Sequence, residues 1–80
     1  MGYNVIAGAL KHGVGEEDIG HALRQRWRVF ATDDDSVVMV IGPSQAAEPL
    51  EVGVKIDEGS ITVIHAMPAR EKFLTGWWLP

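Results

Sequence analysis

Residues that can carry acid–base chemistry gather in the last third of the chain. His65 ends an apolar run, Glu51 lies in an alternating run before it, and Arg70 and Lys72 follow the histidine closely. An imidazole and a carboxylate can exchange protons with a substrate, and basic side chains can offset negative charge on a phosphate. This pattern predicts general acid–base chemistry at a strand end. A strand-end ion pair followed by solvated basic residues is the structural alternative.

The turn between the two runs determines whether Glu51 and His65 meet. Asp57–Gly59 fits a three-residue hairpin loop with glycine in the left-handed position, which places Glu51 opposite His65. A two-residue loop would place Glu51 opposite Ala66 instead. We favour the first register because it gathers the apolar residues of both strands on one face. Directly opposed side chains have Cβ atoms about 5 Å apart, so the carboxylate would fix the tautomer of the imidazole.

The other two histidines are weaker candidates. His12 stands between Lys11 and Gly13, where it can act in catalysis or serve as a helix C-terminal residue. His21 is expected to be partly buried at the edge of a helix stripe. No two histidines have the i, i+4 or His-x-His spacing of a metal site, so we expect neither a metal nor another cofactor.

The periodicity of the chain predicts an α+β fold within a single domain, residues 1–80. Helical spacing covers about residues 4–12, although a strand at 3–6 is an alternative, and a second helix begins at the acidic residues 16–18. The expected architecture is two N-terminal helices packed on a four-stranded antiparallel sheet, followed by a short C-terminal helix or tail over about residues 68–75. The strands are expected at 27–32, 37–41, 50–56 and 60–67.

Composition narrows the class of protein. The chain has 80 residues, a net charge of −4 and no cysteine, which favours a cytoplasmic protein without disulfides. An acidic total argues against broad capture of nucleic acid, but Arg24, Arg26, Arg28, Arg70 and Lys72 concentrate most of the positive charge in two segments. No segment resembles a signal peptide or membrane anchor. The terminal run at 77–80, Trp-Trp-Leu-Pro, is apolar enough to pack on the domain or on another chain.

Several short motifs together resemble the BrnT-like toxins of bacterial type II toxin–antitoxin systems, in the RelE/BrnT superfamily. They span about residues 9–74 and are listed in chain order as Lys11-His12-Gly13-Val14, Glu16-Glu17-Asp18-Ile19, Arg28-Val29-Phe30, Val40-Ile41-Gly42 and Ile64-His65-Ala66 with Arg70. The resemblance implies a compact α+β fold, ribonuclease activity against messenger RNA and neutralisation by an antitoxin protein. His65 and Met67 depart from the family pattern, as does the acidic charge. The resemblance therefore implies either a catalytic set rebuilt around His65, Glu51 and Arg70 or a lost activity.

Two functions from different classes follow. The first is an mRNA-cleaving toxin in which Glu51 or His65 is the base, His65 or His12 is the acid, and Arg70 with Lys72 or Lys11 binds the phosphate. The second is a non-catalytic interaction module that uses a sheet edge or the tryptophan tail to bind a partner or a second copy. Loss of toxicity in a folded His65→Ala variant separates the two.

Overall fold

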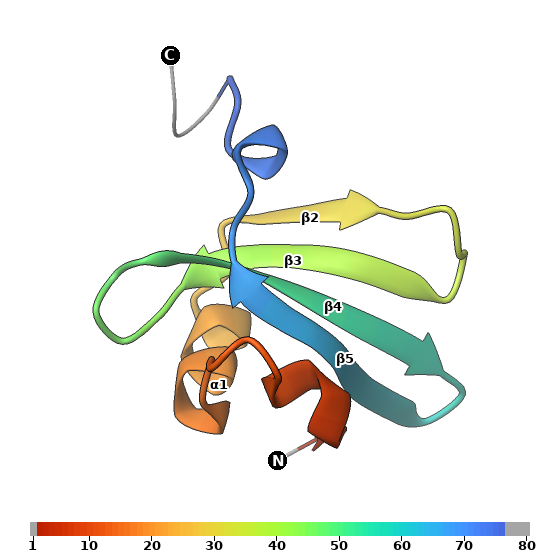
Figure 1. The fold of residues 1–80 in the computed structure, drawn as a ribbon. Helices are drawn as coiled ribbons and strands as arrows, with labels where there is room; N and C mark the ends of the chain where they lie inside the picture. The colour runs from red at the N-terminus through yellow and green to blue at the C-terminus, as the bar shows by residue number, and fades with distance from the viewer. Residues whose placement is uncertain (1, 77–80) are drawn as a thin grey trace.

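A five-stranded mixed sheet forms the body of the protein in the computed structural model, which describes residues 2–76 (Figure 1). The sheet order is β1-β5-β4-β3-β2, and β1 runs parallel to β5 while the other neighbours are antiparallel. The fold is therefore α+β, as expected, but the sheet is neither four-stranded nor wholly antiparallel. The strands are β1 (Asn4–Val5), β2 (Arg28–Ala31), β3 (Val37–Pro43), β4 (Pro49–Asp57) and β5 (Ser60–Pro68).

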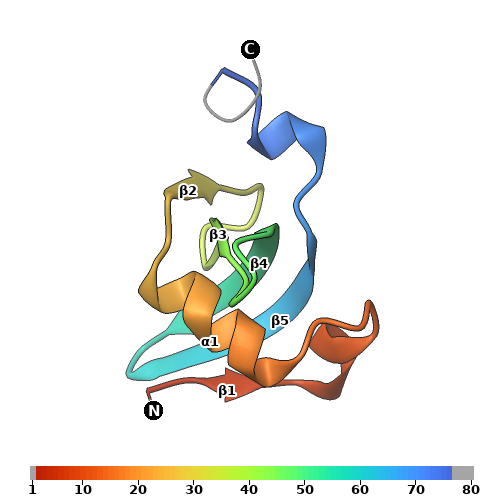
Figure 2. The same cartoon turned by 90° about the vertical axis from the view of Figure 1, so that its left-hand side faces the viewer.

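One α-helix, α1 (Glu16–Arg24), packs on one face of β3 and β4 (Figure 2). Three acidic residues occupy its first turn, where they favour the positive end of the helix dipole. Ile19 and Ala22 are fully buried against the sheet. Gly42 on β3 allows this close approach, because a Cβ atom there would overlap the carbonyl oxygen of Ala22.

The expected first helix over residues 4–12 is wrong, and the alternative strand is close to what forms. Asn4 and Val5 pair with Thr62 and Val63, and a single 3-10 turn, η1 (Ala7–Leu10), follows. Isolated helices this short are marginal in water, since nucleation is costly. Pairing with β5 gives the same residues backbone partners at once, and the Ile6 N–H extends it by donating to the Val63 carbonyl at 3.1 Å.

The favoured register of the last hairpin is also wrong. Asp57 pairs with Ser60, so the loop has two residues, and Gly59 takes the left-handed φ of 69° that favours glycine. A bulge between Gly53 and Val54 then shifts the pairing by one more residue. Glu51 consequently lies opposite Met67 rather than His65.

Between residues 69 and 76 the chain forms one short 3-10 turn, η2 (Glu71–Phe73), within the span where a short helix or tail is expected. The apolar run at 77–80 lies outside the described residues. Within residues 2–76, no helix is long and apolar enough to cross a membrane.

The helix α1 packs on one face of the sheet and not on the other. We call the face that carries α1 the helix face and the opposite one the open face. Two cross-strand rows define the open face from β2 to β5. They are Arg28, Ile41, Glu51 and Met67 in one row, and Phe30, Met39, Gly53 and His65 in the next.

Candidate active site

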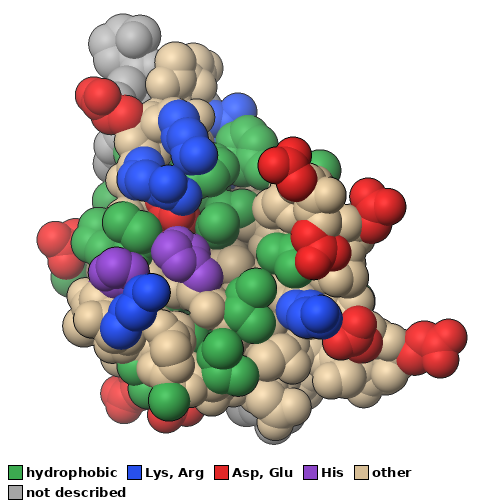
Figure 3. Space-filling view, turned by 45° about the vertical axis from the view of Figure 1, so that its right-hand side comes forward, with side chains coloured by type: hydrophobic (Ala, Val, Ile, Leu, Met, Phe, Trp, Pro, Cys, Tyr) green, Lys and Arg blue, Asp and Glu red, His purple; other side chains and the backbone are tan. Residues whose placement is uncertain are grey.

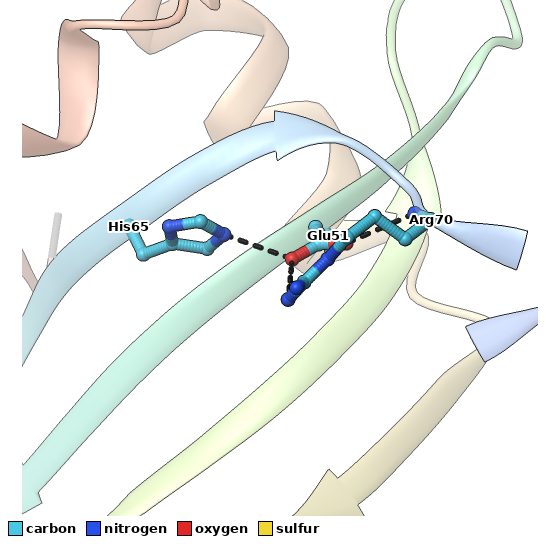
Figure 4. A network of polar contacts seen from close by, with 3 residues as sticks. All are labelled: Glu51, His65 and Arg70. Carbon is cyan, nitrogen blue, oxygen red and sulfur yellow. Dashed lines mark hydrogen bonds and ion pairs between the residues drawn. The ribbon is translucent and has the colours of Figure 1, made fainter. Parts of the chain in front are cut away.

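A buried carboxylate lies at the centre of the open face. Glu51 is fully buried, and its side chain accepts hydrogen bonds from His65 on β5 and from Arg70, which follows β5 (Figure 4). Arg70 donates through its backbone N–H and its Nε to Oε1, each at 2.9 Å, and through Nη2 to Oε2 at 2.8 Å. His65 Nε2 lies 2.9 Å from Oε2. Every oxygen of the buried group is therefore satisfied, as a buried charge requires.

These contacts decide the charge of Glu51. Burial by itself would raise the pKa of the Glu51 carboxyl, but the hydrogen bonds from Arg70 and His65 outweigh it and hold that pKa below its usual range. The same pair raises the pKa of the Arg70 guanidinium, chiefly through its hydrogen bond to Glu51. Glu51 is thus a permanent anion at neutral pH, with both oxygens occupied. It is poorly suited to take a proton from a substrate and well suited to orient its neighbours.

The orientation of His65 depends on the glycine that lies opposite it on β4. His65 pairs with Gly53 on β4, and a Cβ atom at Gly53 would lie 3.0 Å from the Cβ of His65. Because glycine leaves that space open, the imidazole extends diagonally across β4 to reach Glu51. An ionised carboxylate only accepts, so Nε2 of His65 must carry the hydrogen. The neutral ring then has its lone pair on Nδ1, the nitrogen not bonded to Glu51.

A second histidine stands beside the first. His12 belongs to the turn after η1, and its ring centroid is 6.0 Å from that of His65 with an interplanar angle of 73°. Figure 3 shows two adjacent histidine side chains on this face, with basic side chains on either side of them. The His65 side chain is 27% exposed and His12 is exposed, so a substrate can reach both rings. Lys11 precedes His12 and is exposed as well.

Basic and aromatic residues form a surface, the basic and aromatic ledge, next to the histidines. Its residues are Arg28, Phe30, Arg70, Lys72 and Phe73. The Lys72 ammonium lies 5.0 Å and the Arg70 guanidinium 5.4 Å from the ring centroid of Phe73, within the range of cation–π attraction. Phe73 also contacts Phe30 at 5.3 Å between ring centroids, and the Arg28 guanidinium lies 4.9 Å from the Phe30 centroid. The side chain of Arg70 is 48% exposed despite its bond to Glu51, so it can still meet a ligand.

The structure brings most of the expected site residues together. Glu51, His65 and Arg70 form one bonded cluster, His12 is in ring contact with it, and Lys72 flanks it through Phe73. Among the described residues, Lys11 has no hydrogen bond or ion pair to the cluster, and it is placed near it by its position next to His12 in the chain. His21 is half-buried, as expected, and lies 2.8 Å through Nδ1 from the Pro43 carbonyl, apart from this group.

The sequence patterns did not assign Gly53, Phe30 or Phe73 to the site. The alternation of Arg28 and Phe30 was a usable signal, because residues two apart on a strand share a face. Gly53 interrupts an otherwise apolar and β-branched strand, and such a glycine often marks a bulge or a close approach. Here it marks both.

The arrangement can perform proton transfer beside a bound anion. Two solvent-accessible imidazoles can act as acid and base, one of them held in a single tautomer, while cationic groups lie next to them. Within residues 2–76, no three histidine or carboxylate side chains come close enough together to hold a metal ion. No protein-family model matches this chain, and no curated protein or solved structure matches it either.

Proposed function

We propose that this protein is an endoribonuclease toxin of a bacterial type II toxin–antitoxin system, which cleaves messenger RNA in the cytoplasm by metal-independent acid–base chemistry. The observation that carries the proposal is the His12–His65 pair, with His65 oriented by the buried Glu51 and the rings 6.0 Å apart. RNA supplies its own nucleophile, the ribose 2′-hydroxyl, so a base, an acid and a cationic site complete the chemistry.

The tautomer of His65 indicates which histidine is the base and which is the acid. Nδ1 of His65 takes the proton from the 2′-hydroxyl, and the freed O2′ attacks the adjacent phosphorus. The bond from phosphorus to O5′ breaks as protonated His12 gives its proton to that oxygen, which leaves a 2′,3′-cyclic phosphate and a 5′-hydroxyl. Of the two bases considered from sequence, we therefore assign His65, and Glu51 becomes the residue that positions it.

The basic and aromatic residues beside the histidines bind the phosphate and a neighbouring base of the RNA. Arg70, with Lys72 or Lys11, offsets the charge that builds on the phosphorane-like transition state. Phe73 offers a ring on which an unpaired base can stack, the way single-stranded RNA is commonly held. The overall charge is −4, but the acidic runs 33–35 and 57–58 lie in the β2–β3 and β4–β5 turns, at the opposite end of the sheet from η2 (Figure 1).

Cleavage of end-labelled RNA in the presence of a chelator tests the proposal. Purified wild type should cleave, and His65→Ala and His12→Ala should each lose at least about a hundredfold in rate while keeping the wild-type circular dichroism. His21→Gln is the matched control, because it changes a histidine outside the cluster. The products should carry cyclic phosphate and 5′-hydroxyl ends.

Wild type that leaves RNA intact, or cleavage that survives both histidine substitutions, would reject the ribonuclease. A non-catalytic interaction module would then be the better account of the chain. Toxicity on expression that a protein encoded beside this one relieves would support the toxin–antitoxin assignment; toxicity unchanged by that neighbour would count against it.

A further inference from the structure

A second surface, on the helix face, has no role in the chemistry above. Beside α1 the sheet is hollowed by a groove of about 420 Å³, whose floor and walls include Leu23, Val38, Val54 and Tyr3. Three large apolar residues at its margin are unusually exposed: Val29 by 53%, Ile56 by 49% and Ile61 by 40%. Scattered apolar residues are ordinary on a surface, but a continuous apolar groove marks an interaction site.

The groove has opposite charge at its two ends. Arg26 lines the end next to α1 and is exposed. At the other end, Ile56 and Ile61 lead directly into the turn with Asp57 and Glu58. The neighbouring β2–β3 turn adds the exposed run 33–35, three aspartates. One end of the groove therefore carries the positive charge of Arg26, and the other leads to two turns that together hold five acidic side chains.

We infer that this groove is the interface of a symmetric homodimer, in which a second copy of the chain covers it. A two-fold axis through the groove sets the apolar margin of one copy against that of the other. It also sets the α1 end of each copy against the acidic turns of its partner. A surface with complementary ends is self-complementary under such an axis, as an isologous contact requires.

The dimensions of the elements agree with this packing. Two stacked sheets lie about 10 Å apart, and a helix with its side chains is about 10–12 Å thick. Because α1 covers only part of its sheet face, it leaves a step of about one helix thickness beside it. The part of the second copy's sheet that its own α1 leaves uncovered can pack beside α1 of the first copy. The two sheets then stack face to face, with one α1 at each end of the stack. The open face, with His12 and His65, stays in solvent on both copies.

Sedimentation equilibrium or light scattering across a concentration series tests the inference. The wild-type chain should form dimers, and Ile61→Asp should raise the dissociation constant at least about tenfold, because it buries an unpaired charge among apolar residues. Ile6→Asp is the matched control: Ile6 is 45% exposed but lies outside the groove, so its dimer should persist.

Charge reversal gives a second test that does not disturb the apolar surface. Arg26→Glu should weaken the dimer at low salt, and adding Asp57→Lys and Glu58→Lys to it should restore much of the affinity. A chain that stays monomeric up to several hundred micromolar would overturn the inference. So would a dimer that Ile61→Asp and Arg26→Glu both leave unchanged, since its interface would then lie elsewhere.

Discussion

At the scale of single residues, the molecule is organised around one carboxylate that never meets solvent. Glu51 is held by the guanidinium and backbone of Arg70 and by the ring of His65. Removing one partner of a buried ion pair costs far more than the net value of the pair, because the remaining charge loses its compensation. In this site a lone Arg70 would still be hydrated, because it is half-exposed, whereas a lone Glu51 would be a fully buried charge without compensation.

Neutralising that carboxylate should destabilise the fold. Glu51→Gln should lower the free energy of unfolding at pH 7 by about 2–3 kcal/mol, because a glutamine oxygen cannot replace the charge-assisted bonds from Arg70. Urea unfolding of the two proteins measures this difference. Glu48→Gln is the control, since Glu48 is exposed and its substitution should stay within about 0.5 kcal/mol of wild type.

The same pair of proteins should differ in their response to acid. The folded pKa of Glu51 is lowered, so its stabilising effect is complete above the unfolded pKa of about 4.3 and is lost as the pH falls through the folded value. The wild type should therefore lose stability more steeply than Glu51→Gln below about pH 4.3. Parallel slopes for the two proteins would mean that Glu51 is not a lowered-pKa anion in the folded state.

Gly53 should matter more for activity than for stability. A methyl group at this position would lie 3.0 Å from the Cβ of His65, so the histidine must shift by a few tenths of an ångström from the position in which it bonds Glu51. On the proposed function, Gly53→Ala should reduce the rate constant for RNA cleavage about tenfold with little change in KM, because orientation is lost while binding is kept. Gly8→Ala, where a Cβ meets only an ordinary contact, should leave the rate unchanged.

At the scale of elements, the packing of α1 depends on one residue of β3 that has no side chain, Gly42. The helix reaches the sheet at Gly42, where the backbone of Ala22 occupies the space that a Cβ would need. Gly42→Ala should push α1 away from β3 and destabilise the protein by about 1–3 kcal/mol or more. Thermal unfolding followed by circular dichroism would measure it, and a melting temperature equal to that of wild type would show that the helix can move aside freely.

The β4–β5 hairpin shows how a small irregularity in an element positions chemistry. A bulge at Gly53 and Val54 shifts the strands by one residue, so that His65 faces a glycine and reaches Glu51 diagonally. In a regular ladder continued from the same turn, Glu51 would face Ala66, and no histidine would share its row. The bulge thus places the imidazole and the carboxylate on the same face of the sheet.

At the scale of the whole molecule, the two faces of one sheet are separate surfaces. The acid–base cluster lies on the open face and the apolar groove lies on the helix face, with the strands between them. If both proposals hold, Ile61→Asp should remain a ribonuclease with wild-type activity per chain, and His65→Ala should remain a dimer. Measuring cleavage and mass on both variants checks this separation, and a loss of both properties in either variant would contradict it.

Local patterns in the chain were sufficient for the elements with strong signals. The acidic start and apolar stripe of α1 predicted a helix at its observed place, and the four antiparallel strands were located within two residues of their observed ends. These features depend on neighbours along the chain, so periodicity and turn residues reveal them. The α+β class follows from the same information.

Long-range contacts decided the rest. The strand β1 exists because β5 offers its edge, and a short N-terminal segment gains more from that pairing than from a marginal helix. Glu51 and His65 were expected to meet as direct cross-strand partners, and they meet diagonally because a bulge and a glycine allow it. The hydrogen bonds of Arg70 and the approach of His12 depend on how separate segments pack. No pattern along the chain encodes them, because packing is decided by every element at once.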